Sequence, residues 1–105
     1  MSLLCKFSFC FSADSIVEGR GLVTNPKKGN CIACHKIPLD DRIFTLANIG
    51  PPLIKLKERF SIKELTDYIW DPTIIYPETI MPPYGKNNLI DSHEIKAIID
   101  YLYEY

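Results

Sequence analysis

The chain has 105 residues, of which 47% are hydrophobic and 24% charged, and its formal charge is −1. This length suits one small domain with a single core. The near-neutral charge argues against a nucleic-acid binder, which needs a basic excess to neutralise phosphates. No apolar run approaches the roughly 18 residues of a membrane span, so we expect one globular domain without such a span.

The first segment, MSLLCKFSFCFSADS, is apolar and ends in small residues, like the tail of a secretory signal. Lys6 interrupts it, however, and no basic region precedes it. We therefore interpret residues 1–13 as a signal remnant or a disordered N-terminus, and expect the folded domain to span residues 14–105. Cys5 and Cys10 fall in the first segment and are left out of the predicted site.

A first helix is predicted from Asp14 to about Thr24, with Asp14 or Ser15 as its N-cap. Gly19 and Gly21 lie inside this helix, and each lowers its propensity by about 1 kcal/mol relative to alanine. Close approach of another helix is the commonest reason for such a cost. The segment TNPKKGN then breaks the helical pattern.

The stretch CIACHK, residues 31–36, carries the pattern C-x-x-C-H, which is typical of covalent haem attachment. In that chemistry Cys31 and Cys34 each add to a haem vinyl group, and His35 on the same turn binds the iron. A redox dithiol is an alternative, but it needs a preceding strand that the sequence does not indicate. A zinc site is another, and it would have to recruit His93 as a ligand.

The segment that follows, IPLDDRIFTLANIGPPL, contains three prolines and no sustained period. We expect a long loop here, and such loops in compact domains usually serve a function, such as wrapping a bound group. The carbonyl of Pro51 is a candidate acceptor for the ring N–H of His35. A simple turn made by Gly50, Pro51 and Pro52 explains the same residues equally well.

Two capping boxes predict two further helices. Ser61 and Glu64 begin a helix that ends at about Pro72, and Asp91 and Glu94 begin the last helix. One apolar stripe along the last helix consists of Ile95, Ile98, Ile99 and Leu102.

Between these two helices the proline-rich segment DPTIIYPETIMPPYGKNN holds Met81. Pro82 and Pro83 stiffen the backbone after Met81, which helps to hold a thioether at a fixed distance from iron. We therefore predict Met81 as the axial ligand opposite His35, with His93 as a rival that we expect to be exposed. Coordination by histidine and methionine raises the reduction potential and leaves no open position on iron, which indicates an electron carrier.

The stretches GNCIACHKIP, NIGPPL, KERF, IWDPTIIYPETIMPPYGKN and EIKAIIDYLYEY together resemble class I monohaem cytochromes c, and more narrowly the SoxX family. The resemblance runs from about residue 14 to the end. It implies an all-α class I cytochrome c fold, with three main helices and long proline-rich loops wrapped around one covalently attached haem c. Cys31 and Cys34 match the thioether positions, and His35 and Met81 match the axial iron ligands.

Pro51 matches the family's proline behind the histidine, and Gly19 matches the glycine at which the first and last helices cross, near Tyr101. SoxX proteins are periplasmic subunits that pair with a SoxA-type cytochrome in the SoxAX L-cysteine S-thiosulfotransferase, which joins thiosulfate to a cysteine of the carrier protein SoxYZ. The resemblance thus implies a heterodimer in which this chain has no catalytic residue and relays electrons to a soluble acceptor. The alternative is a free-standing, diffusible monohaem cytochrome c.

Overall fold

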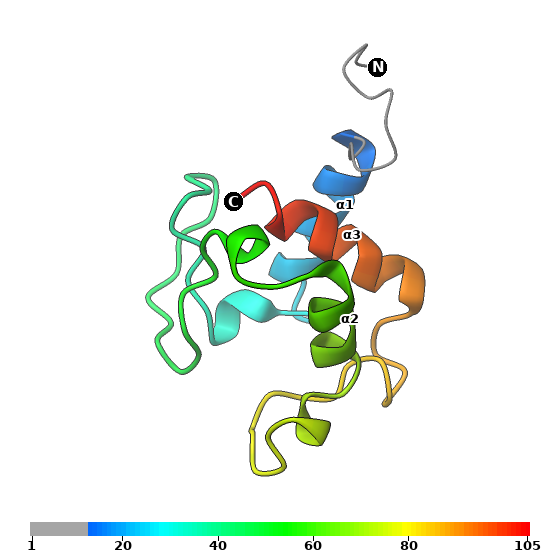
Figure 1. Ribbon diagram of the computed structural model, residues 1–105. Coiled ribbons are helices and arrows are strands. Elements are labelled where there is room, and N and C mark those ends of the chain that lie inside the picture. The colour runs from blue at the N-terminus through cyan, green and yellow to red at the C-terminus, as the bar shows by residue number, and fades with distance from the viewer. Residues whose placement is uncertain (1–12) are drawn as a thin grey trace.

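The computed structural model describes residues 13–105, and within them the chain is helical and contains no strand (Figure 1). Cys5, Cys10 and the rest of the predicted signal remnant up to residue 12 lie outside the described residues. The α-helices are α1, Ala13–Thr24, α2, Ile62–Trp70, and α3, Ser92–Leu102. The single-turn 3-10 helices are η1, Cys31–Ala33, η2, Leu56–Glu58, and η3, Pro72–Ile74. Among residues 13–105 no helix is both long and apolar enough to cross a membrane.

Both predicted capping boxes are formed. Ser61 Oγ accepts a hydrogen bond from the backbone N–H of Glu64 at 3.0 Å, and Glu64 Oε1 accepts one from the N–H of Ser61 at 2.8 Å. Asp91 and Glu94 make the same reciprocal pair at 2.8 and 3.0 Å. These bonds satisfy N–H groups that a helix start otherwise leaves without partners, so α2 and α3 begin where the sequence predicted.

The predicted start of α1 is wrong. This helix already includes Ala13, so Asp14 and Ser15 lie within it instead of capping it. Ser15 is used by a tertiary contact, because its hydroxyl lies 2.5 Å from Oδ2 of Asp100, a buried carboxylate on α3. Ser15 thus bonds to a residue 85 positions away along the chain instead of capping α1.

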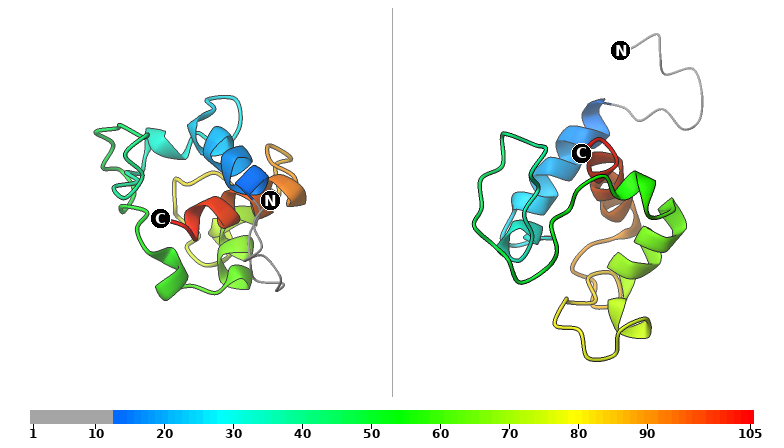
Figure 2. Two further views of the ribbon diagram at one scale, coloured as in Figure 1. Left: turned by 90° about the horizontal axis from the view of Figure 1, so that it is seen from above. Right: turned by 60° about the vertical axis from the view of Figure 1, so that its left-hand side comes forward.

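Helices α1 and α3 cross in close contact, as Figures 1 and 2 show. A Cβ added to Gly19 would lie 2.1 Å from the carbonyl oxygen of Ala97 and 2.6 Å from Cβ of Tyr101. Glycine is therefore required at position 19 by the helix crossing, which confirms the expected reason for it. Gly21 is different, because an added Cβ there would meet nothing within 4 Å. Nothing in the structure explains the glycine at position 21.

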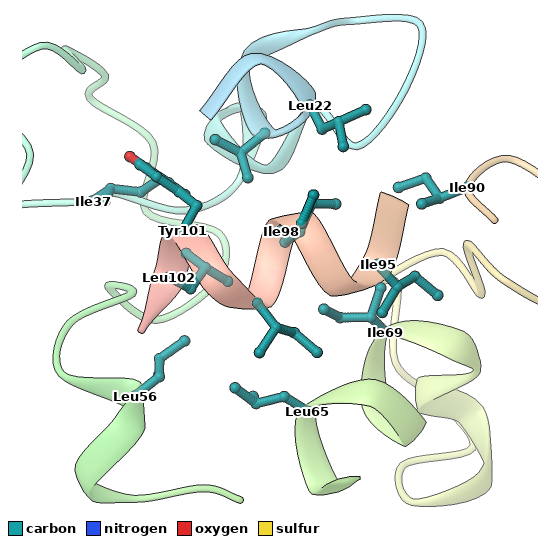
Figure 3. Close-up of a cluster of buried hydrophobic side chains, with 13 residues drawn as sticks. Leu22, Ile37, Leu56, Leu65, Ile69, Ile90, Ile95, Ile98, Tyr101 and Leu102 are labelled. Carbon is teal, nitrogen blue, oxygen red and sulfur yellow. The ribbon is translucent and has the colours of Figure 1, made fainter. Parts of the chain in front are cut away.

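The core is arranged around α3, whose predicted apolar stripe is buried (Figure 3). Helix α1 covers one side of it with Leu22 and Val23, and α2 covers another with Leu65 and Ile69. The loop residues Ile37 and Ile90 and Leu56 of η2 complete the cluster. The two long loops thus extend from a compact three-helix core (Figure 2).

A buried carboxylate ties the loop after the cysteine motif to this helix crossing. Asp40 Oδ2 accepts hydrogen bonds from Arg20 Nε on α1 at 2.9 Å and from the Tyr101 hydroxyl on α3 at 2.6 Å. Asp40 Oδ1 accepts one from the backbone N–H of Arg42 at 3.0 Å. Burial opposes ionisation of Asp40, but the hydrogen bonds from Tyr101 and Arg20 outweigh it and lower the pKa of this carboxyl. Asp40 therefore remains ionised and joins three segments of the chain.

Candidate haem-binding site

The cysteine motif forms one tight turn. Asn30 adopts a left-handed backbone conformation, with φ 47°, that asparagine tolerates better than most residues, and η1 begins directly after it. The N–H groups of Cys34 and His35 both donate to the carbonyl of Cys31, at 3.1 and 2.9 Å. Cys31, Cys34 and His35 are thereby held together on a single turn, as the C-x-x-C-H chemistry requires.

The two thiols of this turn are partly buried and are not joined in a disulfide. Burial raises the pKa of the Cys31 thiol to about 12. At neutral pH this thiol is therefore protonated, whereas disulfide exchange uses the thiolate. The environment of Cys31 thus disfavours the redox-dithiol alternative.

The ring of His35 is held by the loop that follows it. Nδ1 lies 2.7 Å from the carbonyl oxygen of Pro51. Because a carbonyl only accepts, Nδ1 carries the proton and Nε2 carries the lone pair that a metal ligand needs. Two backbone hydrogen bonds join the same loop to the motif. The N–H of Gly50 donates to the carbonyl of Cys34 at 2.8 Å, and the N–H of Leu53 donates to the carbonyl of Lys36 at 2.8 Å.

Gly50 makes room for the ring of His35, a role that the sequence did not predict. A Cβ added to it would lie 2.3 to 2.8 Å from three atoms of the His35 ring, so the ring packs directly against the glycine backbone. The sequence offered a signal in the stretch NIGPPL, but a simple turn explained it equally well. The structure shows that position 50 must lack a side chain if the His35 ring is to reach Pro51.

Met81 lies on the second long loop and is half-buried against the core. Its N–H donates to Thr79 Oγ1 at 3.2 Å. The hydrogen bonds that join His35 to Pro51 and to the cysteine turn do not include Met81. This loop nevertheless approaches the cysteine turn at Tyr84, whose pKa is raised to about 12 by burial and by the neighbouring thiols of Cys31 and Cys34.

His93, the rival ligand, is exposed as expected. Its Nε2 lies 3.1 Å from Oε1 of Glu18 on α1, and the His93 side chain is 75% exposed. Within residues 13–105, no three side chains of His, Cys, Asp or Glu gather into a group that could hold a metal ion.

Large apolar side chains on both long loops are exposed. Phe44 is 84% and Ile80 78% exposed. Others on the same loops are Leu46, Ile49, Ile74, Ile75 and Tyr76. Both long loops thus leave large apolar side chains uncovered. The two thiols and the imidazole on one turn are the side chains that covalent attachment of haem uses.

No family model matches the chain. It is 35% identical over 79 residues to an uncharacterized lipoprotein of Aquifex aeolicus (strain VF5), an alignment that covers 74% of this chain and 37% of that protein. The chain thus spans little more than a third of this curated relative. In structure, it matches a chain of the crystal structure of SoxXA from P. pantotrophus with a TM-score of 0.70, 24% identity and coverage of 83% of this chain and 78% of that chain. This match confirms the predicted all-α cytochrome c fold.

Proposed function

We propose that the chain is a c-type cytochrome and the electron-transfer subunit of a SoxAX-type L-cysteine S-thiosulfotransferase. The observation that carries the proposal is the turn on which Cys31, Cys34 and His35 meet, with His35 Nδ1 bonded to Pro51. The structural match to the SoxXA crystal structure supports the assignment to that kind of complex.

In this proposal Cys31 and Cys34 would hold one haem c through thioether bonds, and His35 and Met81 would supply the protein ligands of its iron. When bound, haem supplies an iron centre that gains and loses one electron. The protonated Nδ1 of His35 leaves Nε2 for the iron, and the Pro51 carbonyl keeps the imidazole in that tautomer and orientation.

The partner is a SoxA-type cytochrome, which forms a periplasmic heterodimer with this chain. The partner conjugates thiosulfate to SoxYZ, and this chain passes the released electrons to a soluble acceptor without a catalytic residue of its own. The exposed apolar side chains support a lasting partner, because stable interfaces cover more apolar surface than transient redox encounters do.

Covalent haem attachment is tested by producing the chain in a bacterial host that carries haem c maturation machinery. We expect haem absorbance to remain with the polypeptide after acid-acetone extraction, and to be lost when Cys31 and Cys34 are both replaced by alanine. Asp41→Ala, at an exposed position outside the motif, serves as the control and leaves the absorbance unchanged. Complete extraction of haem from the unsubstituted chain would refute the proposal.

The role in a complex is tested by co-expression with a SoxA-type cytochrome. We expect a stable heterodimer whose haem is reduced when thiosulfate and SoxYZ are added. A chain that stays monomeric beside the partner, and exchanges electrons rapidly with a terminal oxidase, would instead be a free-standing diffusible cytochrome c.

A further inference from the structure

The loop that carries Met81 is closed at its base by the two chain segments that flank it. Helix α2 ends at Trp70, and the chain returns to the same place at Gly85 and Lys86 (Figure 2). The N–H of Lys86 donates to the carbonyl of Trp70 at 3.1 Å. We call Trp70, Asp71, Gly85 and Lys86 the loop neck. A loop whose ends meet in this way is an Ω-loop, and frequently a functional one.

Gly85 and the ring of Trp70 are in direct contact at this neck. A Cβ added to Gly85 would lie 2.0 Å from Cε3 of Trp70, 2.4 Å from Cδ2 and 2.7 Å from Cζ3. No glycine among residues 13–105 has a positive φ, so the backbone of Gly85 is open to other residues. The requirement for glycine at position 85 therefore comes entirely from the indole ring.

A second contact closes the neck beside the first. Asp71 is buried and is the N-cap of η3. Its Oδ1 accepts a hydrogen bond from the N–H of Thr73 at 3.0 Å. Its Oδ2 lies 3.7 Å from Nζ of Lys86. Backbone and side chain of Lys86 thus both return to the end of α2.

Above the neck, the backbone has little freedom of its own. The loop contains Pro77, Pro82 and Pro83, which restrict φ, and a short-range hydrogen bond from the N–H of Thr79 to the carbonyl of Tyr76 at 3.0 Å. The neck therefore sets where the thioether of Met81 stands relative to the three-helix core.

We propose that Trp70 and Gly85 are positioning residues for Met81. The indole ring packs against the glycine backbone, and this contact fixes the place of the methionine loop relative to the three-helix core. The inference rests on the proposed function, because it takes Met81 as the iron ligand. It adds two residues that are not part of the predicted site.

The test uses the haem-loaded full chain with Gly85→Ala. The sulfur-to-iron charge-transfer band of the ferric protein reports on Met81, and hydrogen exchange at the Lys86 N–H reports on the neck. We expect Gly85→Ala to reduce the band by at least half and to speed Lys86 exchange at least tenfold. Gly21→Ala is the matched control, since an added Cβ there meets nothing within 4 Å, and it leaves both readouts unchanged.

A double-mutant cycle isolates the contact. In a Trp70→Ala background no indole ring remains for the new methyl group to strike, so adding Gly85→Ala causes no further loss of the band and no faster exchange. An equal effect of Gly85→Ala in both backgrounds would overturn the inference, as would unchanged Lys86 exchange in the single variant.

The two proposals fail in different ways. If the unsubstituted chain lacks the charge-transfer band, methionine ligation is refuted, and with it the positioning of a ligand by Trp70 and Gly85. If the band is present but survives Gly85→Ala undiminished, the proposed function stands and the positioning role of the neck is refuted. Should Gly85→Ala not accumulate, Trp70→Ala alone must still diminish the band, because it removes the same contact from the other side.

Discussion

Replacing Asp40 by asparagine removes one charge and almost no volume from the centre of the molecule. Four groups that face this carboxylate can all donate: the guanidinium of Arg20, the hydroxyl of Tyr101, the N–H of Arg42, and the Arg42 guanidinium, whose Nη1 lies 3.6 Å from Oδ1 of Asp40. An asparagine has one oxygen and one NH2 group, so its NH2 must face at least one of these donors. At that point a hydrogen bond becomes a donor–donor contact, and the charge of Arg20 loses its counterion.

The expected loss of stability follows from the burial of the pair. Breaking a buried ion pair by removing one partner costs roughly 3–5 kcal/mol. The Asp40 side chain is 0% exposed, whereas that of Arg20 is 19% exposed and can still reach water. We therefore expect the lower end of that range, about 3 kcal/mol. At about 4–8 °C per kcal/mol for a domain of this size, the midpoint of thermal unfolding falls by about 15 °C.

Thermal unfolding of the haem-loaded chain at pH 7, followed by far-UV circular dichroism, measures this loss. Asp41→Asn is the control, because Asp41 is exposed and its replacement changes the midpoint little. A midpoint for Asp40→Asn within 2 °C of the unsubstituted chain would show that the network does not hold the loop to the helix crossing.

The difference in unfolding midpoint between the unsubstituted chain and Asp40→Asn is expected to change with pH. The pKa of Asp40 is lower in the folded chain than its ordinary value of 3.8. Its contribution to stability is therefore present above about pH 3.8 and is lost as the pH falls through the folded-state pKa. The unsubstituted chain loses this contribution in acid, whereas Asp40→Asn has none to lose. The difference between their unfolding midpoints should narrow below pH 3.8; a constant difference would contradict the assignment.

Three further substitutions test other parts of the structure. Gly19→Ala forces α1 and α3 apart, because the new methyl group would strike the backbone oxygen of Ala97, and we expect a loss of about 3 kcal/mol in denaturant unfolding; an unchanged midpoint would contradict the close crossing. Met81→Ala should abolish the sulfur-to-iron charge-transfer band and lower the reduction potential, and an unchanged spectrum would mean another ligand. Gly50→Ala should displace the ring of His35 from Pro51 and shift the potential, while a potential equal to that of the unsubstituted chain would show that the ring tolerates a methyl group beside it.

Local patterns predicted the local structure well. Helices α2 and α3 begin at their capping boxes because both partners of each box lie within three residues of one another. The motif at residues 31–36 forms one turn for the same reason, since its spacing determines its geometry. The predicted N-cap of α1 was wrong, because Asp14 and Ser15 both lie inside the helix, and the bond from Ser15 to Asp100 joins residues that no window of neighbouring sequence contains.

Taken alone, the sequence determined that the chain is all-α, where its last two helices start, and which residues carry the thiols and the imidazole. It left open whether Gly50, Pro51 and Pro52 are a turn or a support for His35, and it did not reveal the roles of Asp40, Trp70 and Gly85. Those depend on contacts between segments that are distant along the chain, from Trp70 to Gly85 and from Asp40 to Tyr101. Only the tertiary structure decides such contacts, because packing a helix core brings together side chains and backbone that have no fixed spacing in sequence.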